Sequence, residues 1–135
     1  MAEDILYKIA YQYNTLESGI TVPTVLRFND ITADVKAKID TGSTFCVFER
    51  IHGENLGLDI ETGIPLRIST ATGVFDTFGH TINLSILTLE TESTVYFAAE
   101  ESFYLNILGR QGWLDRVKLG LIDYEGKLLL SEYGN

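Results

Sequence analysis

Apolar and polar residues alternate along most of this chain. Between Ile5 and Tyr13 an apolar or aromatic residue occupies every second position, until Gly19 breaks the pattern. A period of two is typical of a strand with one buried face, because successive side chains point to opposite sides. Similar patterns predict further strands at 22–28, 35–39, 45–48, 66–69, 76–89, 94–98, 106–109, 119–124 and 127–131.

Helical patterns are few. Glu49 to Leu56 has the spacing of a brief helix closed by Gly57, and Gln111 to Val117 has that of a short C-terminal helix. Many short strands with one such C-terminal helix indicate a mainly β fold, a small closed β-barrel. A chain of 135 residues is long enough to bury a genuine core as a single domain, residues 1–135.

One motif bears candidate chemistry. Ile39-Asp40-Thr41-Gly42-Ser43 follows a predicted strand directly. A carboxylate there emerges from a rigid support, and glycine lets the backbone turn sharply beside it. The hydroxyls of Thr41 and Ser43 can donate hydrogen bonds, with Ser43 suited to the outer oxygen of an ionised carboxylate. An ordinary Asx turn between two strands has the same residues, so this motif alone does not separate catalysis from a plain turn.

A second motif lies downstream. Ile107-Leu108-Gly109-Arg110 is an apolar strand ending in glycine, and it runs into the predicted C-terminal helix. Between the two motifs, small residues at 70–73 predict the tip of a mobile hairpin. In this order, the two motifs and the hairpin resemble the retropepsin-like aspartic proteases over residues 22–130, in particular single-domain members encoded in bacterial genomes.

The resemblance implies a role for each matching residue. Asp40 would be catalytic, and the apolar strand would pass through the loop that bears it. The supporting residues would be Thr41, Gly42, Ser43, Ile107, Leu108 and Gly109. The substrate-binding flap would comprise Ala71, Thr72, Gly73 and Val74.

Such chemistry needs two carboxylates that share one proton, and this chain offers one. We therefore expect a homodimeric aspartic endopeptidase that acts on peptide or protein substrates without a metal or other cofactor. The alternative is a non-catalytic peptide-binding or dimerisation module on the same fold.

The chain departs from the viral members of the family in three places, one of which is the flap, where Thr72, Gly73 and Val74 do not form their glycine-rich tip. Thr44 stands where they have an acidic residue, so Arg110 is expected to lack its usual partner. The last two predicted strands are expected to pair with each other, which would leave the N-terminal segment or an edge strand to complete the dimer interface.

Charge restricts the partners. The net charge of −9, without a cluster of basic residues, argues against nucleic acid. The same charge opposes self-association, so a dimer should tighten with salt or mild acid. Apolar runs are too short to cross a membrane, and the first residues lack the features of a secretory signal, so a soluble protein of the cytoplasm is expected.

Other reactive residues have plainer predicted roles. His52 and His80 lack metal-ligand spacing, and Cys46 has no evident base, which favours a small buried hydrophobe. Glu61-Thr62-Gly63 imitates an active-site tripeptide but precedes a proline, and we interpret it as a plain turn. Trp113 is expected to pack under the barrel.

Overall fold

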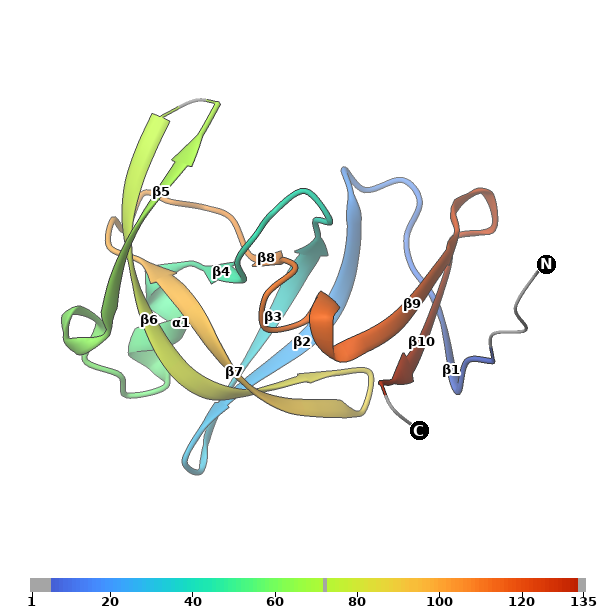
Figure 1. The fold of residues 1–135 in the computed structure, drawn as a ribbon, viewed down its shortest axis with the longest axis horizontal. Helices are drawn as coiled ribbons and strands as arrows, with labels where there is room; N and C mark the ends of the chain where they lie inside the picture. The colour runs from blue at the N-terminus through green and yellow to red at the C-terminus, as the bar shows by residue number, and fades with distance from the viewer. Residues whose placement is uncertain (1–5, 72, 134–135) are drawn as a thin grey trace.

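The computed structural model describes residues 6–71 and 73–133. Within them, seven strands form one sheet (Figure 1). Their order across the sheet is β2 (Ile20–Phe28), β3 (Ile31–Ile39), β8 (Ile107–Leu108), β4 (Val47–Phe48), β7 (Leu89–Ala98), β6 (Gly73–Ile86) and β5 (Ile64–Thr70). An additional pairing of β2 with β6 brings the sheet back on itself. The expected mainly β barrel is confirmed.

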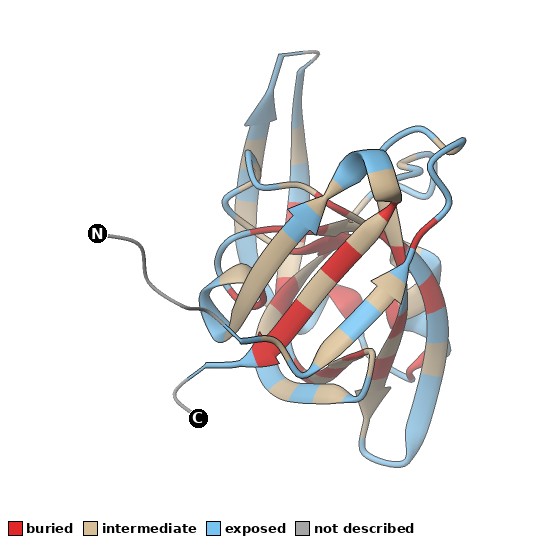
Figure 2. Ribbon diagram, turned by 90° about the vertical axis from the view of Figure 1, so that its right-hand side faces the viewer, coloured by how far each residue is buried: buried red, intermediate tan, exposed pale blue. Residues whose placement is uncertain are grey.

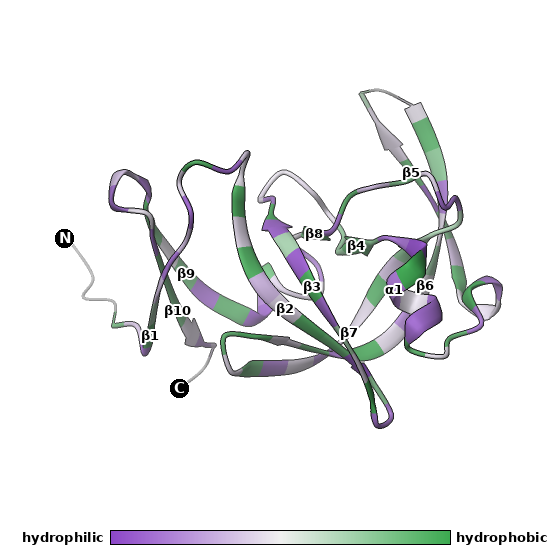
Figure 3. Ribbon diagram, turned by 180° about the vertical axis from the view of Figure 1, so that it is seen from behind, coloured by the Kyte–Doolittle hydropathy of each residue, from purple (hydrophilic) through white to green (hydrophobic). Residues whose placement is uncertain are grey.

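The alternating pattern decides which face of each strand is buried. On β2, Val22 and Leu26 have no exposed surface, whereas Pro23 between them is exposed. Hydrophobic and hydrophilic residues alternate along β2 and β3 (Figure 3). The two strands pair antiparallel through a turn at 29–30, where Asn29 has a φ of 55°. Asparagine tolerates this left-handed conformation, which explains the turn signal.

The boundary between β6 and β7 differs from the prediction. The sequence pattern predicts one strand over 76–89 and another over 94–98, but the chain reverses at Leu87 and Thr88, with φ values of 50° and 75°. Leucine and threonine rarely adopt positive φ, and the sequence has neither glycine nor asparagine here to mark a turn. The predicted strand over 76–89 is therefore divided into the two strands of a hairpin at a place that has no turn signal.

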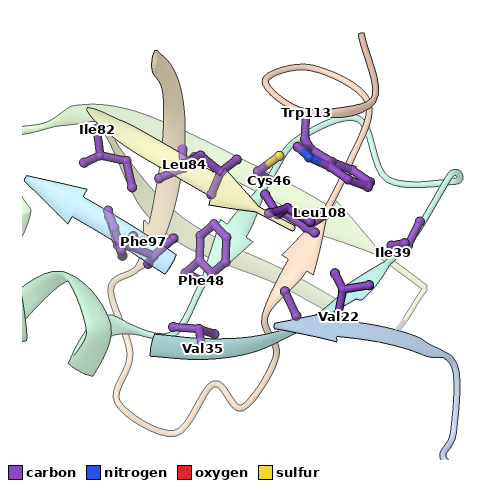
Figure 4. Close-up of a cluster of buried hydrophobic side chains, with 14 of the residues drawn as sticks. Val22, Val35, Ile39, Cys46, Phe48, Ile82, Leu84, Phe97, Leu108 and Trp113 are labelled. Carbon is purple, nitrogen blue, oxygen red and sulfur yellow. The ribbon is translucent and has the colours of Figure 1, made fainter. Parts of the chain in front are cut away.

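The core fills the barrel. Phe48, Phe97, Leu108 and Trp113 are at most 1% exposed and lie together in one cluster (Figure 4). The predicted position of Trp113 under the barrel is confirmed. Helix α1 (Arg50–Asn55) lies where the brief helix was expected. No helix of the described residues has the length and apolar character needed to span a membrane.

The C-terminal helix is shorter than predicted. Instead of spanning 111–117, it is a single 3-10 turn, η2 (Leu114–Arg116). Gly112 has a φ of 103°, and its N–H donates to the Asp115 carboxylate at 3.0 Å. Gln111 forms a bridge with Phe45. The chain is therefore bridged to the Asp40 loop at Gln111 and turns at 112–113 before η2 begins, because its backbone binds that loop and the side chain of Asp115.

A three-stranded sheet lies beside the barrel (Figure 2). Its order is β1 (Ile9–Gln12), β10 (Lys127–Glu132) and β9 (Val117–Ile122), all antiparallel. The 3-10 turn η3 (Asp123–Glu125) joins β9 to β10, so the last two strands pair with each other as expected. Strand β1 starts later than the alternating pattern predicts and pairs with β10 of its own chain. A further 3-10 turn, η1 (Ile60–Thr62), contains Glu61 and Thr62 of the tripeptide that imitates an active-site motif, in agreement with its interpretation as a turn.

Candidate active site

Asp40 is the first residue after β3, and its position is fixed by backbone hydrogen bonds. Its N–H donates to the carbonyl of Leu108 at 3.0 Å. The N–H of Gly42 donates to Oδ1 of Asp40 at 2.9 Å, and the N–H of Ser43 donates to the Asp40 carbonyl at 3.1 Å. This Asx turn restricts the side chain, because Oδ1 is engaged while the half-buried carboxylate stays reachable.

Strand β8 braces the loop from within. It lies between β3 and β4, which flank the Asp40 loop in sequence (Figure 1). Leu108 is paired in parallel with Ile39, and Ile107 is paired with both Lys38 and Val47. The apolar strand thus passes through the loop that bears the aspartate, as the resemblance implies.

The chain after β8 continues this support. The N–H of Arg110 donates to the Ser43 carbonyl at 2.9 Å, and that of Gln111 donates to the Thr44 carbonyl at 2.8 Å. The loop is therefore hydrogen-bonded from both ends of the second motif, and its backbone cannot move without breaking bonds to β8 and its continuation.

The hydroxyl of Ser43 is placed differently from the prediction, whereas that of Thr41 is not tested. Ser43 Oγ donates to the carbonyl of Phe45 at 2.8 Å, so within this chain the hydroxyl stabilises its own loop instead of the Asp40 carboxylate. The exposed hydroxyl of Thr41 has no hydrogen-bond partner among the described residues. Thr41 thus keeps a donor and an acceptor for a group outside the chain.

A groove with a cavity volume of about 660 Å³ lies between the Asp40 loop and the hairpin of β5 and β6. Asp40, Gly42 and Ser43 line one side. Gly73 and Val74 line the other, where β5 and β6 pair up to Thr70 and Gly73. The hairpin projects from the barrel (Figure 1), as expected of a flap. Ala71 is exposed at its tip outside the groove lining, and Thr72 lies outside the described residues.

Sequence patterns missed much of the apolar lining. Phe75, Phe103 and Leu105 also line the groove, and the rings of Phe75 and Phe103 lie 4.6 Å apart at 31°. Phe75 lies on the flap, whereas the other two lie in the loop between β7 and β8. For Phe103 and Leu105, the one sequence signal is an aromatic residue in a segment without a periodic pattern of apolar positions.

Nearby polar groups have structural roles. Arg110 forms no ion pair with any described residue, as expected from Thr44. Cys46 is fully buried, and burial raises the pKa of its thiol to about 11. Its Sγ accepts a hydrogen bond from the N–H of Gly109 at 3.4 Å. His80 Nε2 is 2.9 Å from the Ile60 carbonyl, which fixes its ring against η1. Over the described ranges, no three metal-ligating side chains lie together.

No family model and no curated protein matches the sequence. Among solved structures, the chain is similar to the retroviral protease of EIAV complexed with the inhibitor HBY-793. The TM-score is 0.56 and the identity 22%, over 74% of this chain and 88% of the viral one. At this identity the likeness concerns the fold. The chain has a retropepsin-like fold.

Proposed function

We propose that this chain is a homodimeric aspartic endopeptidase in which each subunit contributes Asp40. One observation carries the proposal: the Asp40 carboxylate is fixed at a strand end and lines a groove opposite a flap. In viral members of the family, the chain termini of the two subunits interleave in one sheet, whereas β1 pairs with β10 of its own chain here. This pairing favours the single-domain bacterial type over the viral type. Its cytoplasmic location stays a prediction.

The chemistry would use one proton shared by two Asp40 side chains. The ionised carboxylate takes a proton from a water molecule as the water oxygen attacks the peptide carbonyl carbon. The protonated carboxyl group gives its proton to the carbonyl oxygen, which yields a neutral gem-diol. As the C–N bond breaks, the carboxyl group that took the water proton donates it to the leaving nitrogen, and the other carboxylate takes a proton from one gem-diol hydroxyl. The new carboxyl group forms, and the dyad again holds one shared proton. None of these steps requires a metal or another cofactor.

The groove favours an extended peptide with apolar side chains. Ile68, Phe75, Phe103 and Leu105 provide apolar lining, and the flap strands present backbone on one side. An extended peptide added between flap and floor would make main-chain hydrogen bonds, and alternate side chains would enter the apolar parts. The substrate class is therefore a peptide or an unfolded protein segment.

The direct test is Asp40→Asn. The amide keeps an oxygen acceptor for the N–H of Gly42 but cannot ionise, so fold and dimer should persist while cleavage falls by about 1,000-fold or more. A peptide library assayed by mass spectrometry, with sedimentation of both proteins, gives the two readouts. Cleavage retained by the variant would exclude the dyad. Peptide binding without cleavage by the wild type would support the non-catalytic module.

A further inference from the structure

Two large apolar side chains stand almost entirely in solvent. Leu16 is 94% exposed in the loop between β1 and β2, and Tyr124 is 91% exposed in η3. Leu16 is held by an Asx turn, in which its N–H donates to Oδ1 of Asn14 at 2.9 Å. An apolar side chain fixed on an ordered turn can be buried by a partner at a lower entropy cost than one on a flexible segment.

The two turns form one unit. The N–H of Tyr13 donates to the Gly126 carbonyl at 2.9 Å, and the Tyr13 hydroxyl donates to Asp123 Oδ1 at 2.5 Å. The side chain of Gln12 donates to the Glu125 carbonyl at 2.7 Å. These bonds connect the start of one loop to both ends of the turn that bears Tyr124. We call the residues 13–17 and 123–126 together the paired-turn surface.

The paired-turn surface lies on the same side of the molecule as Asp40. The loop between β1 and β2, the loop after β3, the turn η3 and the flap all project toward the upper edge, seen from the front and from behind (Figures 1 and 3). The loop leads into Ile20, which pairs with Ile39, the residue before Asp40. If two Asp40 side chains share a proton, this side must face the partner; the inference rests on the proposed function in this respect.

Charge opposes self-association less at the paired-turn surface than the net charge of −9 suggests. The carboxylates of the paired-turn surface each have a partner in their own chain. Glu17 pairs with Lys36 at 2.5 Å, Asp123 accepts from Tyr13, and Glu125 pairs with Lys127 at 3.8 Å. Lys36 also holds the pKa of the Glu17 carboxyl below its usual range. The two lysines therefore offset the charge of Glu17 and Glu125, which weakens repulsion between copies here, whereas Asp123 keeps its negative charge beside the neutral Tyr13 hydroxyl.

We infer that Leu16 and Tyr124 are the anchors through which a second copy of this chain docks beside the two-fold axis that joins the Asp40 side chains. Pairing of β1 with β10 commits the N-terminal strand to its own subunit, so the dimer needs a surface other than exchanged N-terminal strands. The paired-turn surface provides two exposed apolar side chains on hydrogen-bonded turns, beside two glutamates that are paired with lysines.

The test is the dimer dissociation constant, measured by sedimentation equilibrium at fixed salt. Leu16→Asp and Tyr124→Asp should each raise it about ten-fold or more, because a charge would enter an apolar contact. Ile31→Asp is the matched control. It adds the same charge at a 47% exposed apolar residue that starts β3, about 30 Å along the strand from Asp40. Circular dichroism verifies the fold of each variant.

The outcomes separate this inference from the proposed function. A wild-type dimer whose dissociation constant is unchanged by Leu16→Asp and Tyr124→Asp would overturn the inference and leave the protease proposal intact. Equal weakening by all three variants would also overturn it, since net charge would then explain the effect. A dimer weakened only by the two anchor variants, in a protein without Asp40-dependent cleavage, would support the interface while contradicting the protease proposal.

Discussion

Gly109 lies directly against the carbonyl group of Phe45. A Cβ atom on Gly109 would stand 2.2 Å from the Phe45 oxygen and 2.8 Å from that of Ser43. Both are backbone atoms of the loop after Asp40, and that backbone is fixed by bonds to the chain that follows β8. The second motif therefore requires glycine because two segments of backbone approach too closely for any side chain.

Gly109→Ala should consequently destabilise the protein by about 3 kcal/mol or more and abolish cleavage, because the loop must move to admit the methyl group. Urea denaturation measures the stability. Gly42→Ala is the matched variant: its Cβ would stand 3.3 Å from Oδ1 of Asp40, a side-chain atom. Its stability should stay within about 1 kcal/mol of the wild type while cleavage falls. Equal stability losses would contradict the account of Gly109.

Phe103→Ala should raise KM about ten-fold with a smaller change in kcat. The ring contacts Phe75 on the flap and lines the groove, so its loss removes both apolar substrate contact and support for the flap. Tyr104→Ala, at a neighbouring side chain that is 78% exposed and outside the groove lining, should leave KM unchanged. Steady-state kinetics on one peptide distinguish the two, and equal effects would exclude a specific role for Phe103.

Cys46 should be unreactive in the folded protein. Its thiol is fully buried with a pKa raised to about 11, so at neutral pH it has neither access to reagents nor thiolate character. A chromogenic disulfide reagent should titrate the thiol only after unfolding in urea. Cys46→Ala should retain cleavage and lose about 1 to 2 kcal/mol of stability. Loss of cleavage in a folded Cys46→Ala protein would reopen a thiol mechanism.

Stability in acid should depend on Glu61. Both oxygens of Glu61 bind the guanidinium of Arg50, at 2.5 and 2.7 Å, and this bond lowers the pKa of the Glu61 carboxyl from its ordinary 4.5. Because the folded pKa lies below the unfolded one, the pair stabilises the protein above pH 4.5, and this contribution is lost as pH falls through the folded value.

Glu61→Gln should therefore lower Tm at neutral pH, and its Tm should converge with that of the wild type as pH falls below 4.5. Thermal unfolding followed by circular dichroism measures both. Glu54→Gln, which removes a single contact to Arg50 at 3.2 Å, should have a smaller effect at neutral pH. A constant difference at every pH would show that Glu61 acts through packing rather than charge.

The dimer should tighten with salt. Two copies with a net charge of −9 each repel, and raising ionic strength from 0.1 to 1 M shortens the screening length from about 10 to about 3 Å. Sedimentation equilibrium should show a dissociation constant that falls several-fold over this range. A constant that rises instead would indicate attraction between opposite charges across the interface, contrary to an apolar contact at Leu16 and Tyr124.

Several features of the fold could be predicted because they depend on local pattern. Period-two alternation located β2 and β3, and the turn at Asn29 had its expected residue. The turn at Leu87 and Thr88 could not be predicted, since its positive φ values are imposed by the pairing of β6 with β7. The C-terminal helix is shorter than predicted for a similar reason: the N–H of Gln111 donates to the Thr44 carbonyl, and the Ser93 hydroxyl donates to the Gly112 carbonyl, both across long sequence separations.

By itself, the sequence determined the position of Asp40 after a strand, the glycines that let backbone approach it, and the presence of one such motif in the chain. These properties are local, and residue type suffices to specify them. Only the tertiary structure decided that β8 runs inside the Asp40 loop, that Phe75 meets Phe103 over the groove, and that Ser43 binds its own loop. Each of these joins segments distant in sequence, and such contacts depend on how the whole barrel closes.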